Sequence, residues 1–159
     1  MGDSRVHIRR GRRTDFTAVM ALLAQGRMPL PSADRATLRR FRLLVADLGT
    51  DFYVATVDGT IVGLVHVTYA RQLTQGPAAV LDRLVVAEAF RGKNIGTALL
   101  DFAQRRARKR GCATFSCGLP TTERSQRGFL ERSGLEAQGE WLVVHWAAAR
   151  APVPVPAEG

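Results

Sequence analysis

The stretch "RGKNIG", residues 91–96, combines the residue types that bind an anion. It follows an apolar run and precedes a helix-like pattern, so it stands where a strand passes into a helix. A helix start presents unpaired N–H groups and a positive dipole end, which suit a phosphate or pyrophosphate. Gly92 and Gly96 have no Cβ to keep an anion away from the backbone, and Arg91 and Lys93 add positive charge. A plain strand-to-helix turn that needs glycine for its geometry is the alternative interpretation.

Other sequence motifs that bind nucleotides or metals are absent. A P-loop requires Lys-Ser or Lys-Thr directly after its second glycine, whereas Thr97 and Ala98 follow Gly96 here. The glycine triplet of a dinucleotide-binding fingerprint does not occur at the required spacing. Cys112 and Cys117, taken with the histidines, show no paired ligand spacing, so we expect no metal site.

The expected secondary structure places this loop between a strand and a long helix. Asp58 and Gly59 favour a type I′ turn between two strands, because both central residues of that turn need positive φ. We expect Thr14 and Ser32 to cap the first two helices and Gly111 to end the third. The expected strands cover 5–9, the hairpin at 51–70, 78–86, 113–117 and 140–146, and the expected helices cover 14–24, 32–48, 94–110 and 125–133.

The order of these elements predicts a single α/β domain. A helical crossover joins 78–86 to 113–117, so these two strands should run parallel, whereas the hairpin strands run antiparallel. We expect a mixed, mostly antiparallel sheet of about six to seven strands, with a parallel pair at its centre, and about four helices. The domain should cover residues 1–149, and the proline-rich residues 150–159 should form a disordered tail.

The composition is that of a globular protein with an excess of arginine. Of the 159 residues, 46% are hydrophobic and 23% are charged, and the net charge is +9. The positive residues gather at 9–13, 39–42 and 105–110. Such clusters are found in nucleic-acid binders, on solvated helix faces and around sites for a small polyanion such as a nucleotide cofactor. No apolar segment has the length of a membrane span or a signal peptide, so we expect a cytoplasmic protein without membrane partners.

The stretch "LDRLVVAEAFRGKNIGTALL", residues 81–100, resembles motif A of the GCN5-related N-acetyltransferase (GNAT) family. That motif is a hydrophobic strand, then [Gln/Arg]-x-x-Gly-x-[Gly/Ala], then a helix. Arg91 and Gly96 match it, and Asn94 stands where the family usually has glycine. Because Asn tolerates positive φ better than other non-glycine residues, we expect the turn to persist.

The resemblance extends beyond motif A. Residues 8–15 look like the family's first strand and the start of its first helix, and the hairpin at 51–70 fits its middle strands. The segment "GFLERSGL", residues 128–135, is similar to the late "FY-x-x-x-GF" signature. In total the resemblance covers about residues 6–146, and it implies a GNAT-like fold in which the two parallel strands splay apart.

The resemblance implies acetyl-CoA as co-substrate. Its pyrophosphate would bind backbone N–H groups of the loop, and its pantetheine arm would pair with the backbone of the preceding strand. A backbone N–H of that strand could also donate to the carbonyl oxygen, which gathers negative charge during acyl transfer. The implied cofactor-binding residues are Leu84, Val85, Val86, Arg91, Gly92, Lys93, Asn94, Ile95, Gly96 and Thr97.

Asp82 is the candidate for the base that removes a proton from the acceptor amine. Strict alternation along the strand places it on the same face as Leu84 and Val86, and many family members carry an acidic residue at the matching position. Apolar neighbours should raise the pKa of this carboxyl. An ion pair with an arginine such as Arg83 or Arg124 is the alternative role.

The group that protonates the leaving thiolate has no clear candidate. In the "FY-x-x-x-GF" signature a Tyr commonly does this, and the corresponding residue here is Leu130, which cannot donate a proton. Ser125, Tyr69 and water are the alternatives. A thiol with a pKa of roughly 8.5 also makes a fair leaving group without an acid.

Three functions follow from these features. The first is transfer of an acetyl group to a primary amine by direct attack in a ternary complex, with a small-molecule or peptide amine as partner. The second is a non-catalytic module that binds acyl-CoA, which Leu130 favours. The third is nucleic-acid binding, which the charge favours and the lack of interleaved aromatic residues disfavours. Trp141 and Trp146 on the last expected strand are candidates for core positions or for a homodimer contact.

Overall fold

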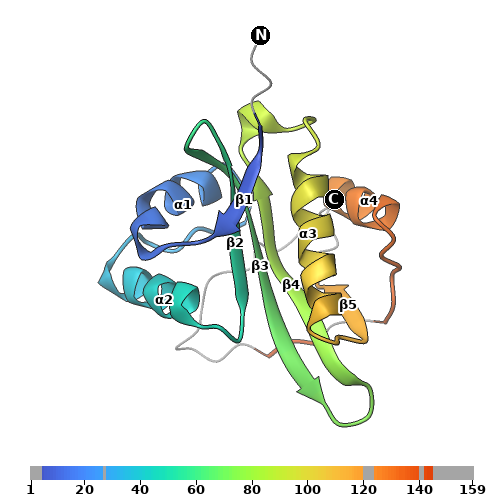
Figure 1. Cartoon of the computed structure of the whole chain (residues 1–159). Helices are drawn as coiled ribbons and strands as arrows, with labels where there is room; N and C mark the ends of the chain where they lie inside the picture. The colour runs from blue at the N-terminus through green and yellow to red at the C-terminus, as the bar shows by residue number, and fades with distance from the viewer. Residues whose placement is uncertain (1–4, 27, 120–123, 140–141, 145–159) are drawn as a thin grey trace, which may run out of the picture. The chain divides into compact units, whose positions relative to one another are not determined.

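Figure 1 shows the protein in a computed structural model, which describes residues 5–26, 28–119, 124–139 and 142–144. The chain divides into two compact units, Met1–Cys117 and Gly118–Gly159, and each is considered by itself. The strands of the first unit are β1 (His7–Arg10), β2 (Asp51–Val57), β3 (Thr60–Gln72), β4 (Gly76–Val86) and β5 (Thr114–Cys117). Its helices are α1 (Phe16–Leu23), α2 (Arg35–Ala46) and α3 (Ile95–Lys109), with short 3-10 turns at Arg13–Asp15 and Glu88–Phe90. The second unit contains α4 (Arg124–Arg132).

The sheet has the mixed topology that the sequence predicts, with fewer strands. Its order is β1-β2-β3-β4-β5; neighbours are antiparallel up to β4, and β4 and β5 are parallel. The described residues thus form five strands, not six or seven, and the parallel pair lies at the sheet's edge. The strand expected over 140–146 accounts for the difference. Its residues 142–144 lie in no strand, and its other residues fall outside the described part of the chain.

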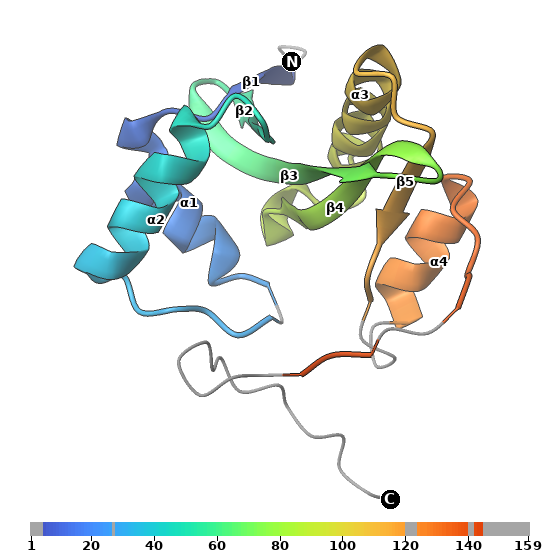
Figure 2. The same ribbon diagram turned by 90° about the horizontal axis from the view of Figure 1, so that it is seen from below.

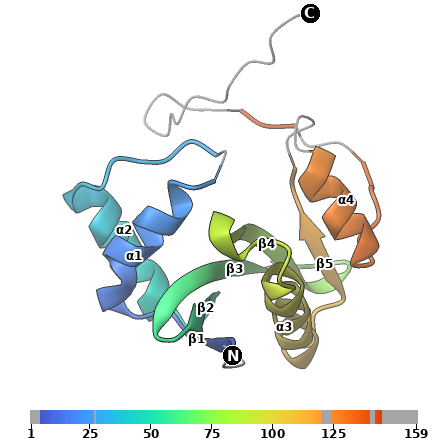
Figure 3. The same ribbon diagram turned by 90° about the horizontal axis from the view of Figure 1, so that it is seen from above.

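The helices of the first unit cover opposite faces of the sheet, with α1 and α2 on one side and α3 on the other (Figures 2 and 3). Two neighbouring residues of β3 mark the division. A Cβ added to Gly63 would meet Leu99 of α3 at 2.9 Å, whereas Leu64 faces α1 and α2. Gly63 is therefore required for the close approach of α3 to the sheet. No helix in the described part of the chain is both long and apolar enough to span a membrane.

The tight turns agree with the sequence, and the helix caps do not. Asp58 (φ +49°) and Gly59 (φ +79°) both have the positive φ that the hairpin turn requires, and Gly111 (φ +78°) follows the end of α3. Thr14 and Ser32 are not the caps. Thr14 lies within a 3-10 turn, and the amide that an N-cap must satisfy in α2 donates to Asp34 at 2.8 Å. Several residues before each helix have side chains that could accept the N-cap hydrogen bond. Residue type alone does not show which of them is the N-cap.

A buried carboxylate fixes α3 to the sheet. Asp51, at the start of β2, is 2% exposed and accepts hydrogen bonds from Arg106 and Arg110 of α3 and from the hydroxyl of Tyr69 on β3. Burial alone would raise the pKa of Asp51, but the hydrogen bonds from Arg106 and Tyr69 and the nearby positive charges outweigh it and lower the pKa. Arg110 also stacks over the Tyr69 ring, 4.3 Å from its centroid.

We predict that Asp51→Asn lowers the free energy of unfolding by about 2–3 kcal/mol, because it removes the carboxylate from two partly buried arginines. Chemical denaturation measures the loss. Since the pKa of Asp51 is lower in the folded chain than in the unfolded chain, its contribution to stability is fully present above the unfolded-state pKa and is lost as pH falls through the folded-state pKa. Asp101→Asn, an exposed change on α3, is the matched control. Equal losses for both variants would contradict the role given to Asp51.

Candidate functional site

A β-bulge in β4 determines which side chains face α1 and α2. His66 of β3 pairs with Arg83, and the next residue, Val67, pairs with Leu81, so Asp82 is an extra residue on β4. A bulge of this kind turns two consecutive side chains to the same side of a sheet. Asp82 and Arg83 accordingly both line one pocket.

The bulge corrects the face assignment made from sequence. Strict alternation put Asp82 on the face of Leu84 and Val86 and put Arg83 on the opposite face. One inserted residue reverses the alternation beyond it, so Arg83 and Val85 continue the face of Asp82. The pairing of Val86 with Gly63, whose Cβ position faces α3, agrees with this assignment.

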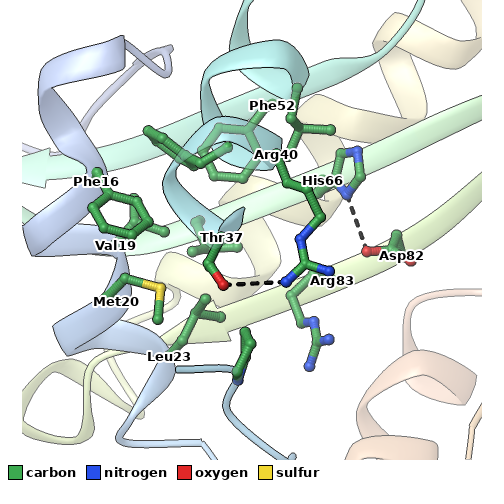
Figure 4. Close-up of a pocket in the computed structure, with 14 residues that line it drawn as sticks. Phe16, Val19, Met20, Leu23, Thr37, Arg40, Phe52, His66, Asp82 and Arg83 are labelled. Atoms are coloured by element: carbon green, nitrogen blue, oxygen red, sulfur yellow. Dashed lines mark hydrogen bonds and ion pairs between the residues drawn. The ribbon is translucent and has the colours of Figure 1, made fainter. Parts of the chain in front are cut away.

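The pocket lies between α1, α2 and the sheet and has a volume of about 260 Å³ (Figure 4). Its wall is mainly apolar and aromatic, and its charged and polar groups are Thr37, Arg40, His66, Asp82 and Arg83. The apolar wall is formed by Phe16, Val19, Met20, Leu23, Phe41, Leu44, Phe52 and Leu64, with Pro31.

His66 and Asp82 form a hydrogen-bonded pair in this pocket. The distance from His66 Nδ1 to Asp82 Oδ2 is 3.0 Å; the His66 side chain is 10% exposed and that of Asp82 is 55% exposed. An ionised carboxylate only accepts hydrogen bonds, so Nδ1 of His66 carries the hydrogen. Nε2 of His66 is buried and has no hydrogen-bond partner among the described residues. Sequence reasoning did not identify His66 as a residue of this site.

The pKa of Asp82 is lowered, not raised. The hydrogen bond from His66 is the largest cause, burial opposes it, and the charges of His66 and Arg83 add to the lowering. The expectation of a raised pKa was wrong because it considered apolar neighbours and no partner on the adjacent strand. The partner of Asp82 is His66, and Arg83 acts on it only through its charge.

The loop at 91–97 has the backbone conformation that the sequence analysis expected. Gly92 (φ +77°) and Asn94 (φ +60°) both have positive φ, and Asn94 directly precedes α3. Nothing lies within 4 Å of a Cβ built on Gly92, so its φ rather than crowding requires glycine there. The first helical hydrogen bond of α3 runs from Ala98 N–H to Asn94 O at 3.0 Å. Among the described residues, the amides of 95–97 donate to no backbone carbonyl.

The two cations of this loop hold it in place. The guanidinium of Arg91 donates to the carbonyl oxygens of Val86, at 3.3 Å, and Gln25, at 3.2 Å. The Gln25 side chain in turn accepts from the backbone N–H of Glu88 at 2.9 Å. Lys93 Nζ lies 4.8 Å from the centroid of the Phe90 ring. Gln25, which sequence reasoning missed, therefore ties the end of α1 to the loop.

The strand that precedes the loop separates from β5. The pairing of β4 with β5 runs from Ala78 to Leu81 and stops, while β4 continues to Val86 with β3 as its partner. Within the described residues, Leu84, Val85 and Val86 therefore have no β5 partner on their second edge. This is the separation of parallel strands that the resemblance implied.

Tyr69 and Leu130 do not supply an acid to this site. The Tyr69 hydroxyl donates to Asp51 at 2.6 Å, and burial and the Asp51 carboxylate raise its pKa. Pairing of Tyr69 with Ala79 puts it on the sheet face of α3, away from Asp82. Leu130 belongs to α4 in the second unit and is 3% exposed. The described residues contain no group of three or more His, Cys, Asp or Glu side chains suited to a metal ion.

One protein-family model matches the chain, and solved structures share its fold. The model of the acetyltransferase (GNAT) family matches residues 18–135. A transcriptional regulator from Bacillus halodurans C-125 is 27% identical, with a TM-score of 0.81 over 89% of this chain and 100% of that one. Glucosamine-6-phosphate N-acetyltransferase from Arabidopsis thaliana is 20% identical, with a TM-score of 0.76 over 89% and 99%. An aminoglycoside N-acetyltransferase solved in complex with CoA is 17% identical, with a TM-score of 0.78 over 92% and 97%. No curated protein matched the sequence.

We predict that Asn94→Gly keeps the stability of the chain, whereas Asn94→Val lowers the free energy of unfolding by about 1–2 kcal/mol, because a β-branched residue is strained at positive φ. Chemical denaturation of the two variants measures the difference. Thr97→Val places the same side chain at an exposed position of α3 without positive φ and is the control. If Asn94→Val and Thr97→Val behave alike, the left-handed conformation of Asn94 is not required.

Proposed function

We propose that this chain, which belongs to the GNAT acetyltransferase family, is an acetyl-CoA-dependent N-acetyltransferase that acts on a primary amine. The reaction is direct attack in a ternary complex. The observation that carries the proposal is that the edge of β4 beyond Leu81, which pairs with no described residue on the side of β5, leads into a positive-φ loop at the start of α3. The family match runs over residues 18–135 and crosses the boundary between the two units, which supports one catalytic domain over both. The bounds 1–149 for this domain, with a tail at 150–159, stay part of the proposal.

The residues at the end of β4 and in the loop fit acetyl-CoA. Ile95, Gly96 and Thr97 have amides that donate to no backbone carbonyl of the described residues, and these amides suit a pyrophosphate. The charges of Arg91 and Lys93 suit it as well. Gly92 and Asn94 give the loop its turn. The backbone of Leu84, Val85 and Val86 offers hydrogen-bonding groups for a pantetheine arm and an N–H for the carbonyl oxygen. When bound, the co-substrate supplies the thioester whose acetyl group is transferred.

Asp82 takes the proton of the acceptor amine. Its Oδ2 accepts from His66, and no bond to Oδ1 is made by any described residue, so Oδ1 is available to the amine. The lowered pKa keeps Asp82 ionised at neutral pH, which favours binding of an ammonium. The bound ammonium first loses one proton to water, because only the neutral amine has the lone pair that attacks the carbonyl carbon. As the nitrogen–carbon bond forms and the carbon–sulfur bond breaks, the nitrogen becomes acidic, so a weak base such as Asp82 suffices to take its second proton. His66 is a positioning residue that fixes the carboxylate, and the sulfur departs as thiolate.

The test of the proposal is release of free thiol from acetyl-CoA in the presence of a panel of amines, alongside calorimetric binding of acetyl-CoA. We expect tight binding and amine-dependent release. Leu130, which replaces the usual Tyr, favours the second candidate, a module that binds acyl-CoA without catalysis. Binding without release across a broad panel would support that candidate, and no binding at all would reject both.

We predict that Asp82→Asn lowers kcat about 100-fold or more, the range for loss of a general base, while the Kd for acetyl-CoA stays within about twofold. The amide keeps the shape and removes the proton acceptor. Initial rates of thiol release and calorimetry give the two quantities. Asp101→Asn, on the opposite face of the sheet, should leave both unchanged. An unchanged kcat in Asp82→Asn would remove Asp82 from the mechanism.

A further inference from the structure

The pocket beside Asp82 contains charges that acetylation of an amine does not by itself require. Arg40 and Arg83 both line it, together with one carboxylate. We infer that the acceptor is a free α-amino acid with a large apolar or aromatic side chain, bound in this pocket with its ammonium at Asp82 and its carboxylate at Arg83 and Arg40. The inference rests on the proposed acetyltransferase function and names the acceptor class for that site.

The bulge sets the spacing of the two charges. Because Asp82 and Arg83 are consecutive and face the same side, a carboxylate and a guanidinium leave the sheet next to each other. An α-amino acid carries its ammonium and carboxylate on one carbon, so its two charges are also adjacent. The pocket therefore offers each charge of a zwitterion an opposite charge, with the fork of an arginine suited to a carboxylate.

Neither Arg40 nor Arg83 forms an ion pair with any described residue, in contrast to several arginines elsewhere in the chain. Arg9 pairs with Asp15, Arg106 and Arg110 pair with Asp51, and Arg127 pairs with Glu131. The guanidinium of Arg40 donates to the hydroxyl of Thr37 at 3.1 Å (Figure 4). Among the described residues, this is the one hydrogen bond of either arginine side chain. Two arginines against one carboxylate would repel a polycationic acceptor such as an aminoglycoside.

The remaining wall of the pocket suits an apolar side chain. The ring centroids of Phe16 and Phe41 are 5.5 Å apart, and those of Phe41 and Phe52 are 5.6 Å apart, so three aromatic rings form a continuous surface. Aromatic groups pack favourably against rings at such spacings. A volume of about 260 Å³ is below the usual range of drug-sized ligand sites, which favours a small acceptor.

The experiment compares L-phenylalanine with 2-phenylethylamine, which lacks only the carboxylate, and with kanamycin, a polycation. Each is tested with the full chain by thiol release from acetyl-CoA and, separately, by calorimetry without acetyl-CoA. We expect kcat/KM for L-phenylalanine to exceed that for 2-phenylethylamine at least about tenfold, the difference made by one charge-assisted contact. Kanamycin should be a poor acceptor.

Variants assign the effect to the arginines. Arg83→Gln should raise KM for L-phenylalanine about tenfold or more and change KM for 2-phenylethylamine less than about twofold. Arg105→Gln removes the same charge from the exposed side of α3 and should change neither. Thermal unfolding of all variants checks that each is folded. If Arg83→Gln does not fold, Arg40→Gln tests the same carboxylate contact at the second arginine.

The outcomes separate this inference from the proposed function. Release of thiol with other amines, but equal or poorer rates with L-phenylalanine than with 2-phenylethylamine, overturns the amino-acid assignment and leaves the acetyltransferase standing. Absence of release with every amine, together with L-phenylalanine binding that weakens in Arg83→Gln, supports the pocket assignment and rejects the reaction. An equal effect of Arg83→Gln on both acceptors overturns the role of the arginine.

Discussion

The extra residue in β4 is the constraint on which the pocket depends. Without the bulge at Asp82, the pairing of β3 and β4 would send Arg83 to the face of α3, among the apolar side chains that pack there. With it, the carboxylate and the guanidinium both reach the pocket, and His66 on β3 lies beside the carboxylate. Bulges are common next to active sites because they redirect side chains in this way. Here one inserted residue supplies the site with both signs of charge.

The position of α3 links this pocket to the loop at 91–97. Asp51 holds Arg106 and Arg110 near the C-terminal end of the helix, and Gly63 lets its N-terminal half approach the sheet. These two contacts fix the helix along its length on the face opposite the pocket. Its N-terminal amides at 95–97, which donate to no backbone carbonyl of the described residues, follow the bulge at Asp82 by 13 to 15 residues, after β4 has ended at Val86. The anion-binding features and the proton acceptor are thus carried by one continuous strand, loop and helix.

The sequence predicted the backbone conformation correctly at positions where a single residue type determines it. Asp58, Gly59 and Gly111 take the conformations expected of them, and Asn94 has the positive φ that its place in the loop requires. The helical pattern between the two expected strands correctly predicted that β4 and β5 are parallel. The bulge was not predicted, because the order of residues in "LDRLVV" does not show where the pairing with β3 is interrupted. His66 and Asp82 meet because of the register between β3 and β4. That register cannot be read from the order of residues along either strand.

Many of the arginines that suggest an anion-binding surface in the composition form contacts within the folded chain. In the cluster at 9–13, Arg9 pairs with Asp15 and Arg10 donates to the carbonyl oxygen of Asp47 at 2.7 Å. In the cluster at 105–110, Arg106 and Arg110 bind Asp51. These side chains join separate elements of the fold, so their charge is partly neutralised within the chain. A nucleic-acid surface needs arginines whose guanidinium groups are free for phosphates, and these four are engaged elsewhere. The positive charge available to a ligand in the described residues around the pocket is that of Arg40 and Arg83, which suits one small anionic group.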